Sequence, residues 1–207
     1  MKPVPQHLSA PLRRAIELQR ASEWSAAEEI YASIIAEAAD HEVVLSSYGS
    51  AILAQERPDD ALPILERAVA VAPDYPQAHI FLGEAYRQLA RFDEALAEIR
   101  HGLVINPKYL DAQIGLGDLL VDLYRLEEAL EAFDVAMDMK PGSPFIGTKR
   151  AQVRFYLGDT DTAETEIRDI VTRYPQHAEA RWVLSCICLA KGDYIEGWRE
   201  YAARWAI

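Results

Sequence analysis

The residue types that could carry out chemistry are scattered along this sequence of 207 residues. Its five histidines fall among termini, turns and different faces of the expected helices: His7, His41, His79, His101 and His177. They show none of the spacings typical of metal ligands. Acidic residues are abundant, but they recur at helix-surface positions, where a solvated face explains them better than a catalytic pair. We therefore expect no metal site.

Motifs for covalent and phosphate chemistry are likewise missing from the sequence. It has no glycine-rich phosphate loop, no nucleophile elbow and no serine-histidine-acid set. Cys186 and Cys188 lie two residues apart on one expected helix, where their side chains diverge, so we expect small buried thiols rather than a disulfide. That usage fits a reducing, cytoplasmic environment. We expect no enzymatic activity and no cofactor.

One pair of charged residues stands out by its spacing. Arg150 and Arg154 are one helical turn apart and share a helix face. In one interpretation their aliphatic stems pack while the guanidinium groups reach neighbouring acidic side chains. In the other interpretation the pair grips an anion or a carboxylate.

The elements that position these residues follow a period of 34. Prolines recur at that interval, at Pro73, Pro107, Pro141 and Pro175. The repeats span residues 8–41, 42–75, 76–109, 110–143, 144–177 and, in part, 178–207. The eighth residue of each repeat is small: Ala15, Gly49, Gly83, Gly117, Ala151 and Ser185. The twentieth is small as well: Ala27, Ala61, Ala95, Ala129, Ala163 and Gly197.

This periodicity predicts pairs of helices that touch at small residues. Small side chains let two helices approach closely, larger apolar ones fill the seam, and proline ends the second helix. We expect twelve helices over about 9–21, 24–38, 42–55, 58–71, 76–89, 92–105, 110–123, 126–139, 144–157, 160–173, 178–191 and 194–205. Asp159 and Asp193 are the expected N-caps of two of them, and Pro58 fits a first helical turn. Pro63 should cost a hydrogen bond or bend its helix.

The pattern resembles the tetratricopeptide repeat, most clearly over residues 81–107 and 115–141. The resemblance implies an all-α, right-handed α-solenoid of about six helix-turn-helix units, forming a single array over residues 1–207. It also implies that the first helices line a concave groove. The ligand-facing positions of the family fall on Gln77, Ile80, Glu84, Arg87, Asp111, Ile114, Asp118, Asp122, Phe145, Gln152, Phe155 and Tyr156.

The charge of that groove suggests its partner. The formal net charge is −12, and repeat 110–143 alone carries eight acidic residues against Arg125 and Lys140. An acidic middle and an aromatic far end would suit an extended peptide with basic and apolar residues, although the acids could simply keep the face soluble. Such a charge argues against nucleic acid or an anionic membrane as the main partner. We expect no membrane insertion, because no stretch of about 18 apolar residues occurs.

The last repeat carries a second resemblance. The segment LAKGDYIEGWREYAARW, residues 189–205, is similar to the closing repeat of bacterial proteins that join a tetratricopeptide array to a glycosyltransferase domain. Trp198, Tyr201 and Trp205 lie on one side of its helix. They either pack on the preceding helix or form an interface that something must cover.

Three functional hypotheses follow. The first is a scaffold that binds a peptide or protein partner in its groove, as the recruiting portion of a bacterial glycosylation or surface-assembly system. The second is a regulatory N-terminal part of a glycosyltransferase whose catalytic domain is absent from these residues. The third is a self-assembling structural scaffold, a homo-oligomer formed through the C-terminal helix.

Overall fold

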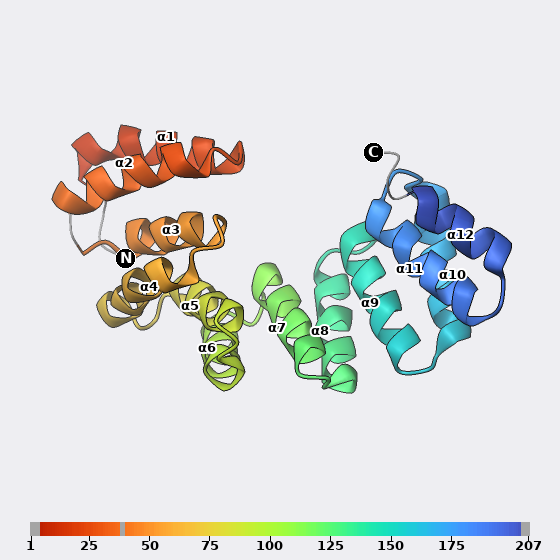
Figure 1. The fold of residues 1–207 in the computed structure, drawn as a ribbon. Helices are drawn as coiled ribbons and strands as arrows, with labels where there is room; N and C mark the ends of the chain where they lie inside the picture. The colour runs from red at the N-terminus through yellow and green to blue at the C-terminus, as the bar shows by residue number, and fades with distance from the viewer. Residues whose placement is uncertain (1–4, 38–39, 204–207) are drawn as a thin grey trace. The chain divides into compact units, whose positions relative to one another are not determined.

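The structure is a computed structural model that describes residues 5–37 and 40–203. Over these residues the chain forms a short 3-10 turn, Gln6–Leu8, and twelve α-helices joined by tight turns (Figure 1). The helices are α1 (Ser9–Arg20), α2 (Trp24–Glu37), α3 (Glu42–Leu53), α4 (Pro58–Val71), α5 (Pro76–Gln88), α6 (Phe92–Ile105), α7 (Leu110–Asp122), α8 (Leu126–Met139), α9 (Pro144–Tyr156), α10 (Thr160–Arg173), α11 (Ala178–Ala190) and α12 (Tyr194–Ala203). Each begins at the expected residue, so the all-α class is confirmed.

The helices fall into two compact units, Met1–Gly115 and Leu116–Ile207, here called the N-terminal and C-terminal units. Most helices pack on the next one along the chain, as α3 does on α4 and α11 on α12. First helices of neighbouring pairs also touch, α3 with α5 and α9 with α11. First helices therefore form one layer of each unit and second helices the other, the stacking of a helix-pair solenoid. A single right-handed array over the whole chain remains a prediction.

The small residues lie where the two helices of a pair meet. A Cβ on Gly83 in α5 would stand 2.6 Å from Cγ1 of Ile99 and 3.1 Å from the carbonyl oxygen of Ala95, both in α6. The same pairing recurs one repeat earlier and one repeat later, between Gly49 and Leu65 and between Gly117 and Phe133. Because side chain and backbone of the partner helix fill the space of a methyl group, only glycine permits this approach.

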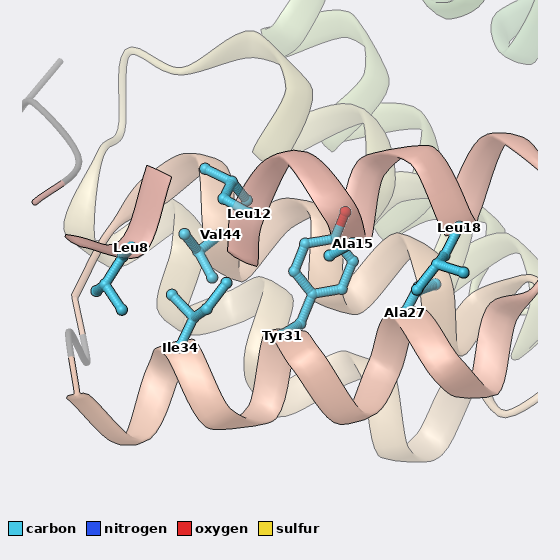
Figure 2. Packing of buried hydrophobic residues seen from close by; sticks show 9 residues of the cluster. Leu8, Leu12, Ala15, Leu18, Ala27, Tyr31, Ile34 and Val44 are labelled. Carbon is cyan, nitrogen blue, oxygen red and sulfur yellow. The ribbon is translucent and has the colours of Figure 1, made fainter. Parts of the chain in front are cut away.

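The first pair shows how larger residues fill the seam (Figure 2). Leu12 and Leu18 of α1 and Ile34 of α2 are buried around the small residue Ala15. Tyr31 points from α2 toward α1 (Figure 2) and is fully buried. Its hydroxyl donates to Oε1 of Gln19 at 2.8 Å. Burying this ring therefore leaves its polar end satisfied.

The turn inside each pair uses a left-handed backbone conformation. Positive φ angles recur every 34 residues, at Ser22, Glu56, Ala90, Tyr124, Gly158 and Gly192. In the third turn the amide of Arg91 donates to the carbonyl oxygen of Tyr86 at 2.8 Å, which closes the end of α5 as a Schellman motif. Only two of the six residues are glycine, so four turns carry the steric cost of a Cβ.

The helix starts confirm the cap at Asp193 and the place of Pro58, and at Asp159 they confirm the position but not a cap hydrogen bond. Oδ1 of Asp193 accepts from the amide of Glu196 at 3.1 Å, and Pro58 is the first residue of α4. Asp159 is the N-cap residue of α10 as expected, but its side chain makes no cap hydrogen bond. Its backbone has φ −79° and ψ 62°, outside the extended conformation that aims an N-cap side chain at the first turn. Pro63 lies inside α4, which continues to Val71.

We predict that Gly83→Ala lowers the free energy of unfolding by about 1–3 kcal/mol, because the added methyl overlaps the backbone of α6. Chemical denaturation followed by circular dichroism measures this loss. Gly115→Ala is the matched control. Among the described residues nothing lies within 4 Å of a Cβ at Gly115, so it should gain about 0.5–1 kcal/mol from helix propensity. Equal effects at both sites would contradict the close-approach explanation.

We also predict opposite effects for exchanging glycine and alanine at equivalent turns. Ala90 has φ 56° and Gly158 has φ 86°. Ala90→Gly removes the steric cost of the Cβ and should stabilise the protein by about 0.5–1 kcal/mol, while Gly158→Ala should destabilise it by a similar amount. Urea denaturation of both variants tests the pair, and destabilisation by Ala90→Gly would show that this turn is not strained.

Candidate functional site

The expected groove residues of the N-terminal unit lie on α5 and the start of α7. Ile80 is only 7% exposed. Its Cδ1 would lie 2.7 Å from a Cβ on Gly102, in the second helix of the same pair. Its side chain therefore fills the seam of α5 and α6 instead of contributing to a surface. Asp111 is exposed and Ile114 partly exposed.

Polar residues of α5 pair with one another. Arg87 donates from Nε and from Nη2 to the two carboxylate oxygens of Glu84, each at 2.9 Å. Nε2 of Gln88 donates to Oε1 of Glu84 at 3.0 Å. These hydrogen bonds join one acidic, one basic and one amide side chain in a single cluster on α5.

In the C-terminal unit one face of α9 carries two exposed rings and two partly buried polar side chains, which we call the α9 surface: Phe145, Lys149, Gln152 and Tyr156. Their spacings of four, three and four residues place them in one row along the helix. Phe145 is 42% exposed and Tyr156 43%. Nε2 of Gln152 donates to the hydroxyl of Tyr156 at 2.9 Å, which holds the ring against the helix.

Lys149 is the member of this surface that the sequence reasoning missed. Its Nζ donates to Oδ1 of Asp118 on α7 at 2.8 Å and lies 4.9 Å from the centre of the Phe145 ring. Such a cation over an aromatic face is attracted by the ring. Asp118 therefore already has a cation beside it, and the acidic middle of the predicted groove is partly neutralised. The only local signal was the spacing of four residues between Phe145 and Lys149.

The remaining groove residues of this unit are divided between surface and core. Asp122 is exposed at the end of α7. Phe155 packs against the core cluster formed by α9, α10 and α11, as does Trp182 of α11. Of the aromatic residues expected at the far end of the groove, Phe145 and Tyr156 are exposed. Phe155 is only partly exposed and contributes mainly to core packing.

Arg150 and Arg154 lie beside acidic residues of the two neighbouring helices. Arg150 donates to Oε1 of Glu166 on α10 at 2.9 Å and to Oδ1 of Asp134 on α8 at 3.3 Å. Arg154 donates to the same Glu166 oxygen. The side chains are 23% and 20% exposed. These contacts match the first interpretation, in which neighbouring acids take both guanidinium groups, and they do not support a grip on an external anion.

The aromatic residues near the C-terminus form an exposed cluster on α12. Trp198 is 58% exposed and meets Tyr201 edge-on, with ring centres 5.6 Å apart. Tyr194 and Ile195 are 64% and 87% exposed. Trp205, the third expected member, lies outside the described residues. Arg168 of α10 donates two hydrogen bonds to Glu196 of α12, at 2.8 and 2.7 Å.

The described residues offer little reactive chemistry. Both cysteines are thiols, and burial raises the pKa of Cys188 to about 11, which keeps it protonated and weakly nucleophilic. Within residues 5–37 and 40–203, no three His, Cys, Asp or Glu side chains gather as a metal site would require. None of the described helices has the length and apolar character needed to cross a membrane.

Models of a known protein family match much of this sequence. Two family models described as tetratricopeptide repeat match the sequence, one over residues 53–103 and the other over 98–144 and 148–206. No curated protein matches it.

Several solved structures share the fold. One is PilW, described as a widely conserved type IV pilus biogenesis factor, with 16% identity, coverage of 98% of this chain and 94% of that one, and a TM-score of 0.85. Another is TTC0263, a thermophilic TPR protein of Thermus thermophilus, with 20% identity, coverage of 88% and 99%, and a TM-score of 0.75. A third is YrrB, described as a TPR protein with an unusual peptide-binding site, with 16% identity, coverage of 84% and 90%, and a TM-score of 0.65.

One histidine is held in a strongly polar setting inside the N-terminal unit. Nδ1 of His79 lies 2.7 Å from Oε2 of Glu98, and Nε2 lies 2.7 Å from the carbonyl oxygen of Pro73. Both ring nitrogens thus face acceptors, and only the protonated ring can donate to both. The hydrogen bond with Glu98 raises the pKa of His79 against the opposing effect of burial, and Pro73 and Asp74 add to the rise. The ring also stacks on His101 at 4.3 Å.

We predict that His79 makes the stability of the protein pH-dependent. Because its pKa is raised on folding, its contribution is fully present below the unfolded value of about 6.5 and is lost as the pH rises through the folded pKa. The difference in unfolding free energy between wild type and His79→Gln should therefore shrink between mildly acidic and alkaline pH. Glu98→Gln should flatten that dependence, and a constant difference would refute the assignment.

Proposed function

Since the chain belongs to the tetratricopeptide repeat family, we propose that it is a non-catalytic scaffold that holds a segment of a partner protein on its first-helix faces. Proteins built from these repeats are generally scaffolds for protein–protein interaction, although a fold alone does not determine a function. In this proposal the chain needs no cofactor and acts in the cytoplasm. Binding, positioning and release of the partner are its whole activity.

The α9 surface is the observation that carries this proposal. Large aromatic rings are costly to leave in water, and rings fixed on a helix give up little conformational freedom on binding. Phe145 and Tyr156 are fixed in this way, one beneath Lys149 and the other by Gln152. Two exposed rings separated by polar side chains on one helix face are suited to recognising another chain.

The chemistry of the partner segment follows from these neighbours. Apolar side chains of an extended peptide would rest on Phe145 and Tyr156, while its backbone groups would meet Gln152 and Lys149. Basic residues would be drawn toward Asp122, which is exposed at the end of α7. The acidic character of the whole chain, with a formal net charge of −12, would speed encounter with such a partner.

For the cellular role, we favour recruitment of partners to a bacterial surface-assembly system. The likeness to PilW over 98% of this chain is compatible with that role, and at 16% identity it reflects the fold. The resemblance of residues 189–205 to repeats that precede a glycosyltransferase domain supports the alternative of a glycosylation system. In that case the chain would recruit acceptor proteins or regulate the transferase.

Self-assembly through α12 is a second candidate function. Tyr194, Ile195 and Trp198 are all more than half exposed on one helix, and an apolar group of this kind commonly marks an interaction surface. Sedimentation at increasing protein concentration separates the two proposals. A monomer at every concentration would remove self-assembly and leave peptide binding intact.

We predict that Tyr156→Ala, and separately Phe145→Ala, weaken binding of peptides selected by phage display on the intact chain by about tenfold or more. Fluorescence anisotropy with the selected peptides measures the affinity. Tyr124→Ala is the matched control, because Tyr124 is 80% exposed but lies in the turn between α7 and α8 and not on α9. Unchanged affinity in both variants, or equal loss in the control, would overturn the assignment of the α9 surface.

A further inference from the structure

The N-terminal unit contains a pocket that shares only Gln77 with the predicted groove. It has a volume of about 560 Å³ and is lined by residues 71–77, which join α4 to α5, together with Glu42 at the start of α3. Val71, Ala72 and the two prolines of the segment provide apolar wall, and Asp74 is exposed at its edge. The polar groups at the base of this pocket are unusual.

Glu42 is a buried acidic residue, and burying a carboxylate costs free energy. The residue is 3% exposed, and its Oε1 is buried without a hydrogen-bond partner. Nδ1 of His41 lies 3.9 Å from its other oxygen. That nitrogen accepts from the amide of Val43 at 3.3 Å, and the Oε1 of Glu42 has no hydrogen bond to it. A carboxylate buried in this way normally has a compensating donor or cation.

A second acceptor lies at the same pocket. Oε1 of Gln77, at the start of α5, is also buried without a partner. Tyr75 lies close enough to feel the charge of Glu42, since burial raises the pKa of Tyr75 and Glu42 raises it further. Two helix starts and the loop between α4 and α5 thus bring two acceptor oxygens and one negative charge to an apolar-walled pocket. None of these groups supplies the donor that the two oxygens require.

We propose that this pocket binds the positively charged head group of a basic side chain, a guanidinium or an ammonium, through Glu42 and Gln77. Such a group carries several N–H donors, so it satisfies both acceptors and neutralises the carboxylate in one step. The apolar wall accommodates the methylene stem that precedes the charge. Only the claim that the side chain belongs to a partner protein rests on the proposed function.

A titration of the intact, ¹⁵N-labelled chain with butylguanidinium and butylammonium tests the pocket by itself. We expect saturable amide shifts at Glu42 and residues 74–78, with a dissociation constant on the order of millimolar for so small a probe. Butylurea has a similar shape but no charge, and it should bind at least about tenfold more weakly. Saturation by butylurea at the same concentration as the cations, or no saturable shift with either cation, overturns the proposal.

Two variants identify the groups responsible. Glu42→Gln should weaken cation binding by about tenfold and also raise the melting temperature of the ligand-free protein, because it removes a buried charge that lacks compensation. Gln77→Leu should weaken binding with the charge retained. Asp93→Asn, on the exposed face of α6, is the matched control and should leave binding unchanged. Undiminished binding in both Glu42→Gln and Gln77→Leu would contradict the assignment.

The outcome is separate from that of the peptide experiment. The pocket lies in the N-terminal unit and is probed with small cations, whereas the α9 surface lies in the C-terminal unit and is probed with peptides. Loss of peptide affinity in Tyr156→Ala together with an inert pocket would sustain the scaffold function and reject only the cation site. If the pocket binds the small cations but the chain selects no peptide, the cation site would be sustained and the peptide-binding scaffold rejected.

Discussion

Three helix pairs, α3 with α4, α5 with α6 and α7 with α8, depend on a close approach at a glycine in the eighth position of the repeat, where a partner side chain occupies the space that a Cβ would need. Ile99 fills this space over Gly83, and Phe133 fills it over Gly117. The contact sets how the first helix is rotated against the second, and therefore which of its faces is left outside the pair. The seam position of Ile80 on α5 follows from that rotation. Surface chemistry in this protein is thus a consequence of packing.

The stacking of the helix pairs also determines where the charged side chains lie. In the C-terminal unit the cations lie mainly between helices: Lys149 beside Asp118, Arg150 and Arg154 beside Glu166, and Arg168 beside Glu196. These pairs tie a helix to one that lies up to a whole repeat away. Because these cations are paired with acidic side chains, the aromatic rings determine the character of the α9 surface as much as charge does. Under the proposed function, recognition in this unit would combine apolar contact with a few oriented polar groups, the usual composition of a protein-binding site.

The molecule departs from local structural preferences at identifiable places. Four turns hold a residue other than glycine in the left-handed conformation; because the turn is repeated, its geometry is imposed by the stacking of the pairs and not by the residue. Glu42 departs in another way, as an acid 3% exposed with one oxygen unpartnered. Local costs of this kind persist where the surrounding structure enforces them, and at binding sites they are offset when the ligand arrives.

The sequence by itself determined the helices, their starting residues and the family, because proline, small residues and apolar spacing act over one or two helical turns and recur every 34 residues. Only the tertiary structure decided what each surface residue does. Lys149 pairs with Asp118, which is 31 residues away, and Ile80 enters the seam because Gly102 leaves it room. Asp159 is the N-cap residue of α10 but makes no cap hydrogen bond at its ψ of 62°, an angle that the sequence pattern did not specify. Such contacts rest on distance in space, which a periodic pattern in one chain does not encode.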